Sequence, residues 1–180
     1  MAKTQKKDYI LNSLFYFTLT IYIVLLFTTI IFKTLDSPLD LINGSYIHYR
    51  KVNLDPYIWD IYMTDYLNKI NILGNVILFI PLPIFYRALS SKNSGKFFKS
   101  IFLSLFLSIF FEIFQFVFEI GVTDINDIIL NTLGGIIGTI IYSLISLLLS
   151  KDKIKEFISI FGGTITFTIS ILIALIKIVN

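Results

Sequence analysis

Four long apolar runs constrain the fold of this chain more than any other feature of its sequence. They cover Ile10–Phe32, Phe97–Ile120, Ile128–Leu149 and Phe157–Val179. An α-helix needs about 20 mainly apolar residues to cross a hydrocarbon core of about 30 Å, and each run is long enough. Inside lipid, only a helix or a closed barrel satisfies its backbone hydrogen bonds. The runs therefore predict membrane-spanning helices.

A fifth run, Ile70–Leu89, is also long enough to cross a membrane, but it contains Pro81 and Pro83. Proline lacks a backbone N–H and clashes with the preceding helical turn, so we expect this helix to kink or unwind in its second half. A composition of 56% hydrophobic and 15% charged residues agrees with a membrane protein. The sequence predicts an all-α, polytopic bundle of about five transmembrane helices.

The basic residues are divided unequally between the two sides that five spans define. With the N-terminus in the cytoplasm, ten of the 15 Lys and Arg residues lie on that side; outside are Lys33, Arg50, Lys51, Lys69 and Lys177. This is the usual bias of membrane proteins. We expect a multi-pass protein of the cell membrane with a cytoplasmic N-terminus and an extracytoplasmic C-terminus. The lysines serve orientation and attraction to the lipid bilayer, and we expect no nucleic-acid partner.

The domain organisation follows from the runs. Residues 1–9 form a basic cytoplasmic N-terminus, residues 10–150 one membrane domain, and residues 151–180 a cytoplasmic turn with a C-terminal transmembrane helix. The domain includes an external loop, residues 33–69, in which Asp55 and Pro56 give a helix-start signal. Trp59 and nearby tyrosines then predict a short helix in the membrane interface. An aromatic platform for a sugar or lipid ligand is the alternative.

Polar side chains interrupt the third run where lipid penalises them. An ionised carboxylate near mid-membrane, such as Glu112, costs at least about 2.5 kcal/mol. Gln115 and Glu119 follow on the same helical face, and Ser108 and Ser104 precede Glu112 by one and two turns toward the cytoplasm. This face therefore meets protein or water. Glu112 is either part of a functional site or a protonated glutamic acid that hydrogen-bonds between helices.

The fourth run supplies candidate partners for Glu112. Asp124 stands at an N-cap position with Asp127 at the third helical position, a pattern that resembles a capping box. Capping does not explain Asn131, which continues the same stripe. Gly134 and Gly138 complete the stripe as a GxxxG pair, which lets another helix approach closely.

Asn75 lies in the outer part of the proline-containing run, so three helices bring amides and carboxylates to one level. We interpret this level as a polar cavity open to the extracytoplasmic side. The chain has no cysteine and a single histidine, His48. A thiolate or histidine metal site is therefore not expected, and we predict no metal and no cofactor.

Several motifs together resemble the VanZ-like family of bacterial membrane proteins. They are "RKVNLDPY" (Arg50–Tyr57), "NILGNVILFIPLP", "EIFQ" (Glu112–Gln115) and "DINDIILNTLGGIIG" (Asp124–Gly138). The resemblance covers roughly residues 10–150, and the name-giving member is associated with resistance to the glycopeptide teicoplanin. It marks as motif positions Arg50, Asn53, Asn75, Glu112, Gln115, Asp124, Asp127, Asn131, Gly134 and Gly138.

Two departures from the family pattern change what the resemblance implies. Many relatives have glycine where this chain has Pro83, so its second span is expected to be more strongly broken. Many also carry an arginine shortly before the acidic element, where residues 120–123 offer none. Arg50 is therefore the external cation expected to pair with the acidic cluster.

Three classes of function remain open. The first is an envelope protein whose outer pocket binds a lipid-linked cell-wall precursor or a glycopeptide. The second is an enzyme acting on a lipid-linked precursor, with Glu112 as general acid or base, or with Asp124 and Asp127 holding a divalent cation. The lack of a recognised nucleophile, histidine cluster or phosphate loop argues against an enzyme. The third is a small lipid or drug transporter, for which glycine-lined helix faces allow an oligomer.

Overall fold

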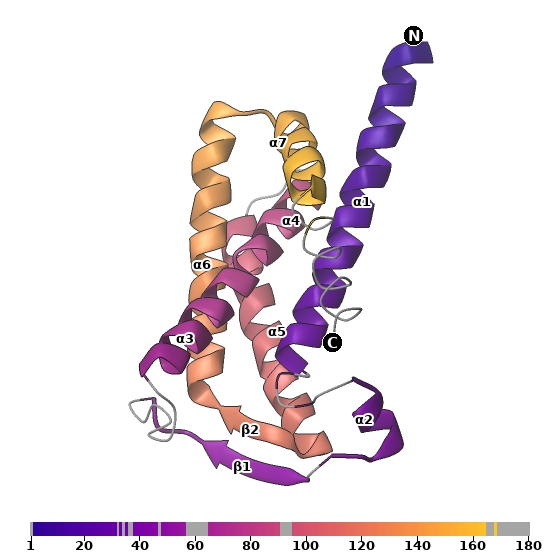
Figure 1. Ribbon diagram of the computed structural model, residues 1–180. Coiled ribbons are helices and arrows are strands. Elements are labelled where there is room, and N and C mark those ends of the chain that lie inside the picture. The colour runs from indigo at the N-terminus through magenta and orange to yellow at the C-terminus, as the bar shows by residue number, and fades with distance from the viewer. Residues whose placement is uncertain are drawn as a thin grey trace. The chain divides into compact units, whose positions relative to one another are not determined.

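A computed structural model describes residues 2–31, 33, 35, 38–46, 48–56, 65–90, 95–164 and 168 (Figure 1). The elements are α1 (Ala2–Ile31), α2 (Pro38–Asn43), β1 (Tyr49–Asn53), α3 (Asp65–Phe79), α4 (Pro81–Leu89), α5 (Lys96–Phe118), β2 (Ile120–Asp124), α6 (Ile125–Leu148), α7 (Lys151–Phe157) and a π-helix, η1 (Ile158–Gly162). The predicted all-α polytopic bundle is confirmed, with one small sheet added to it.

Four helical stretches among the described residues are long and apolar enough to cross a membrane. They are Asp8–Ile31, Lys69–Leu89, Lys96–Phe118 and Ile125–Leu148. These correspond to four of the five predicted spans. Most of the fifth, residues 157–179, lies outside the described residues, as do residues 57–64, on which the interfacial helix was predicted.

The proline-containing span divides into two helices at Ile80, although this residue keeps helical dihedral angles, with φ −58° and ψ −46°. α3 ends at Phe79 and α4 begins at Pro81, with Ile80 between them. The amide of Ile80 donates to the carbonyl of Ile77 at 3.3 Å, a three-residue step that tightens the last turn. Pro81 then occupies the first position of α4, where its missing N–H is tolerated.

A two-stranded parallel sheet was not predicted. β1 pairs with β2 in a register that sets Tyr49 opposite Ile120 and Asn53 opposite Asp124. The link between the predicted spans Phe97–Ile120 and Ile128–Leu149 is therefore not a simple turn, because it contains β2. The reversal after α5 is made instead by Glu119, whose φ of 56° lies in the left-handed region. The sheet fixes where Asp124 and the start of α6 lie.

The chain divides into two compact units, and each is described by itself. Unit 1 comprises Met1–Leu25 and Leu144–Asn180. Its segment Lys151–Phe157 is a helix, not the predicted turn, and the hydroxyl of Ser150 caps it by accepting from the amide of Lys153 at 3.5 Å. The hydroxyl of Ser159 donates to the carbonyl of Leu11 at 3.2 Å, which joins η1 to α1.

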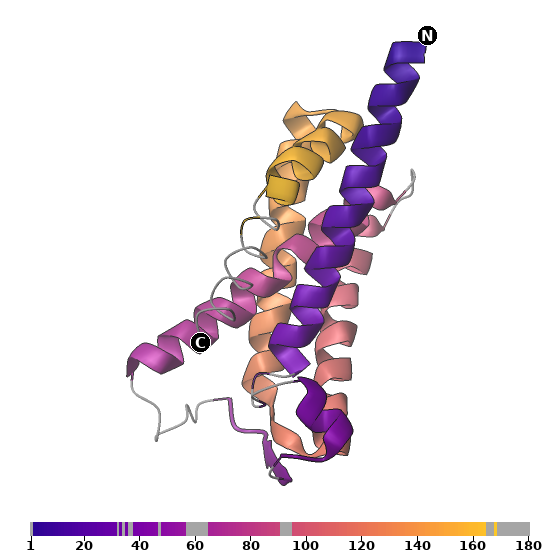
Figure 2. The same cartoon turned by 45° about the vertical axis from the view of Figure 1, so that its right-hand side comes forward.

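Unit 2, Leu26–Ser143, contains the predicted site residues. In both ribbon views α5 and α6 run side by side, and the two strands lie at one end of this pair (Figures 1 and 2). We call this the strand end and the opposite one the far end. Phe111 anchors the core, with its ring centroid 5.0 Å from that of Phe27 and 6.2 Å from that of Phe79. Its side chain is fully buried, as expected of a large aromatic residue between helices.

Candidate functional site

Five polar side chains from separate segments meet at the strand end of unit 2. This strand-end cluster consists of Lys33, Asn75, Glu112, Asp124 and Asp127. Glu112, Asp127 and Asn75 are only 2%, 3% and 4% exposed. Charged groups at such depth are stable only when they are paired or hydrogen-bonded, so the contacts within the cluster define the site.

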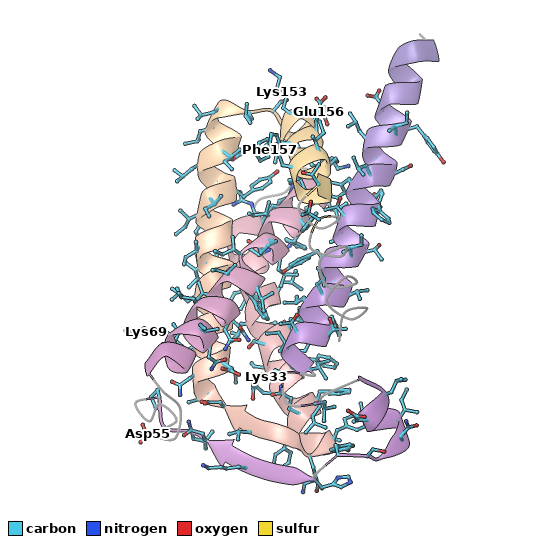
Figure 3. All side chains as sticks on the ribbon, in the orientation of Figure 1. Lys33, Asp55, Lys69, Lys153, Glu156 and Phe157 are labelled. Carbon is cyan, nitrogen blue, oxygen red and sulfur yellow. The ribbon has the colours of Figure 1, made fainter. Side chains whose placement is uncertain are left out.

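Asp127 is the centre of the cluster. One of its carboxylate oxygens accepts from the amide of Asn75 at 2.6 Å, and the other forms an ion pair with Lys33. The Lys33 side chain is 29% exposed and that of Asp127 only 5%. Figure 3 shows Lys33 near the strand end. The lysine therefore links the buried carboxylate to the surface.

The start of α6 is capped by two carboxylates from different elements. Asp124 is the N-cap, because its Oδ1 accepts from the amide of Asn126 at 2.8 Å. The amide of Asp124 itself donates to Glu112 Oε2 at 2.7 Å. A capping box would assign that bond to Asp127, so the predicted box is wrong: Glu112 of α5 takes the role. Both carboxylates lie at the positive end of the α6 dipole, which favours them.

The sheet adds further contacts to this cap. Asn53, the last residue of β1, donates its side-chain amide to Asp124 Oδ1 at 3.2 Å. Thr123 in β2 donates its hydroxyl to the carbonyl of Glu112 at 3.3 Å. The parallel register therefore places Asn53 in the site, although it lies 71 positions from Asp124 in the sequence.

Gln115 and Asn131 flank the cluster in the helix interfaces. The Gln115 amide donates to the carbonyl of Ile30 at 2.8 Å, and the Asn131 amide donates to the hydroxyl of Ser108 at 2.9 Å. Gln115 is 1% exposed and Asn131 is fully buried. Their side-chain oxygens have no hydrogen-bond partner among the described residues. Such buried acceptors are uncommon in proteins and can accept from a donor group.

Arg50 lies outside the cluster, contrary to the expectation that it pairs with the aspartates. Its Nη2 forms an ion pair with Glu119 at 2.7 Å, and its Nε donates to the carbonyl of Phe116 at 3.2 Å. His48 contacts the other oxygen of Glu119 at 3.3 Å. Arg50 therefore stabilises the end of α5, where a cation is favoured by the helix dipole. Lys33 supplies the cation of the acidic cluster.

The glycines of α6 contact the broken span. A β-carbon on Gly134 would overlap with the carbonyl oxygen of Val76, and one on Gly138 with that of Ile80. Gly135, which sequence reasoning missed, faces α5, where a β-carbon would overlap with the side chain of Ser104. The three glycines therefore let α6 lie close to α3–α4 on one side and to α5 on the other.

The arrangement can bind polar groups through one partly exposed cation and several buried oxygens. Among the residues that the structure describes, no three acidic, histidine or cysteine side chains are arranged to hold a metal ion. Within the cluster, Asp127 bonds to Asn75 and Lys33, and the Asp124 amide bonds to Glu112.

Comparison with known proteins gives two matches. Residues 19–147 match the protein family described as VanZ/LLP1. The chain is 34% identical over 144 residues to "Protein VanZ" of Enterococcus faecium, a match that covers 80% of this chain and 83% of that protein. No solved structure matches. Every residue of the strand-end cluster falls within residues 19–147.

Proposed function

The chain belongs to the VanZ/LLP1 family of membrane proteins, and from this premise we propose that its strand-end cluster binds the polar part of an amphiphilic ligand in the cell envelope. The ligand is a lipid-linked cell-wall precursor or a glycopeptide of the teicoplanin type. Through this binding the protein contributes to teicoplanin-type resistance. The resistance link rests on the family resemblance, and the site rests on the geometry.

One observation carries the site assignment. Within unit 2, buried charges and amides are concentrated at the strand end, where Asp127 binds both Lys33 and Asn75. A buried ion pair adds little net stability compared with apolar packing. Stability alone therefore does not explain why buried charges and amides are concentrated at the strand end. Intramembrane ionisable residues commonly mark the functional site of a membrane protein.

The exposure of Lys33 supports binding from the surface. The Lys33 side chain is 29% exposed, whereas that of Asp127 is only 5% exposed. A ligand phosphate or carboxylate would accept from Lys33, and a sugar hydroxyl would donate to the buried side-chain oxygens of Gln115 and Asn131. We place the strand end on the extracytoplasmic side, because the opposite orientation would put most of the basic residues outside.

The test is protection of a susceptible Gram-positive host from teicoplanin, with vancomycin as the comparison drug. Strains express the wild type, Glu112→Ala, Asn131→Ala, or the matched control Ile129→Ala, whose side chain on α6 is 48% exposed. We expect wild type and control to raise the inhibitory concentration of teicoplanin selectively, and both site variants to lose the effect. Membrane levels of each variant are compared by immunoblot.

Protection by both site variants at wild-type level would overturn the site assignment. If the wild type itself protects against neither drug, the resistance role does not hold for this member of the family.

A further inference from the structure

Arg87, in the last turn of α4, reaches across the far end of unit 2 to α6. Its Nη1 donates to the carbonyl of Thr139 at 3.0 Å and to the hydroxyl of Ser143. The guanidinium carbon lies 4.7 Å from the centroid of the Tyr142 ring, and the Tyr142 hydroxyl donates to the carbonyl of Arg87 at 3.4 Å. These contacts hold the guanidinium in one place against α6.

All of these partners are neutral. None of the ion pairs within the described part of unit 2 includes Arg87. The sequence has no Asp or Glu in residues 66–111 or 128–143, so the far halves of the helices around Arg87 supply no carboxylate. Arginine stays protonated in proteins. Arg87 is therefore a half-buried positive charge with no carboxylate partner within the described part of unit 2.

The unused part of the guanidinium indicates which anion fits. Arg87 Nε is buried and has no hydrogen-bond partner among the described residues. Because Nη1 is occupied by α6, Nε and Nη2 remain as one edge of the planar group. Two parallel N–H bonds along such an edge match two oxygens of a phosphate or carboxylate.

Further positive charge lies at the same end. Lys96, in the first turn of α5, donates its Nζ to the carbonyl of Ser90, the C-cap of α4, at 3.1 Å. Lys99 lies on the same helix and is exposed. Clusters of basic residues where transmembrane helices end are typical binding sites for anionic lipid headgroups.

We propose that the Nε–Nη2 edge of Arg87 binds the phosphate of an anionic phospholipid when the groups that cover Nε move aside, with Lys96 and Lys99 adding electrostatic attraction. Phosphate is the anion that a bilayer presents where its helices end, and α4 ends at Leu89, two residues after Arg87. This site is separate from the strand-end cluster and does not depend on the function proposed for it. Inorganic phosphate shares the same chemistry, so the test distinguishes the two sources.

The experiment is native mass spectrometry of the full-length protein in detergent, titrated with phosphatidylglycerol, phosphatidylcholine or inorganic phosphate. We expect the wild type to bind phosphatidylglycerol about tenfold more tightly than phosphatidylcholine. Arg87→Lys keeps the charge but lacks the two-donor edge, and we expect it to lose most of that preference. Arg87→Gln should abolish it. Arg50→Lys is the matched control, because Arg50 lies at the strand end, and should bind as the wild type does.

Equal binding of phosphatidylglycerol by the wild type, Arg87→Lys and Arg87→Gln would overturn the proposal. So would displacement of the lipid by millimolar inorganic phosphate, which would make the site a free-phosphate site. Thermal unfolding identifies variants that fail to fold. If Arg87→Gln fails, Arg87→Lys decides the question, because it retains a cation beside Ser143.

Discussion

The two halves of the buried face of α6 meet their neighbours by opposite means. In the first half, Asp127 and Asn131 contact other helices through charges and amides. In the second half, Gly134 and Gly138 contact them through the backbone, with no side chain between. The glycine half sets how close the helices lie. The polar half adds charged and amide side chains, which are not required for close packing. We therefore assign the fold mainly to the glycine half and the proposed function to the polar half.

Gly138→Val gives the largest expected effect. Its side chain would overlap with the backbone carbonyl of Ile80 and with Pro83, and a backbone clash cannot be relieved by a rotamer change. We expect a loss of about 3 kcal/mol or more in unfolding free energy, at the upper end of the range for overpacked cores. Thermal unfolding in detergent measures it. Gly74→Ala is the matched control, because no atom lies within 4 Å of its added carbon, and it should be neutral or slightly stabilising.

Asp127→Ala comes next. It removes the partner of Lys33 and an acceptor of Asn75, and we expect a loss of about 2 kcal/mol, less than for a fully buried pair because Lys33 is partly exposed. A double-mutant cycle with Lys33→Met isolates the ion pair. Additive losses in the cycle would show that the two side chains do not interact.

A pair of substitutions at Glu112 separates the helix cap from the charge. Glu112→Leu removes the acceptor of the Asp124 amide, and we expect a loss of about 1 kcal/mol, as for other N-cap deletions. Glu112→Gln keeps a side-chain oxygen at that position and should unfold at nearly the wild-type temperature. Equal destabilisation by the two substitutions would contradict the assignment of Glu112 as part of the cap.

Arg50→Gln has the smallest expected effect on stability. Its ion pair with Glu119 is partly exposed, with side chains 46% and 35% accessible, and such pairs contribute less than about 1 kcal/mol. The loss should shrink further at high salt because screening weakens exposed pairs. A loss comparable to that of Asp127→Ala would show that the outer ion pair, and not the buried one, holds the strand end together.

The apolar runs and prolines predict the helices well because membrane insertion and backbone chemistry act locally. The break at Pro81, the N-cap at Asp124 and the shared level of Asn75, Glu112 and Asp127 all follow from spacing along single helices. Pairings across long sequence separations do not follow from spacing. The sheet joins Asn53 to Asp124, and nothing in either short segment specifies its partner.

The same limit explains the two wrong pairings in the site. Lys33 and Arg50 both precede the acidic element by many residues, and only the fold decides that Lys33 meets Asp127 while Arg50 meets Glu119. Likewise, a capping box is a local pattern, and here a glutamate from another helix replaces its second member. One signal for Lys33 was present: it is the first charged residue after the apolar run of α1.

Teicoplanin protection by Glu112→Gln tests the division between fold and function most directly. This variant keeps the shape of the side chain and an oxygen for the Asp124 amide but removes the carboxylate. We predict a protein that reaches the membrane at wild-type level and unfolds within about 2 °C of the wild type, while selective protection is lost. Full protection by this stable variant would contradict a functional role for the carboxylate of Glu112 at the strand end.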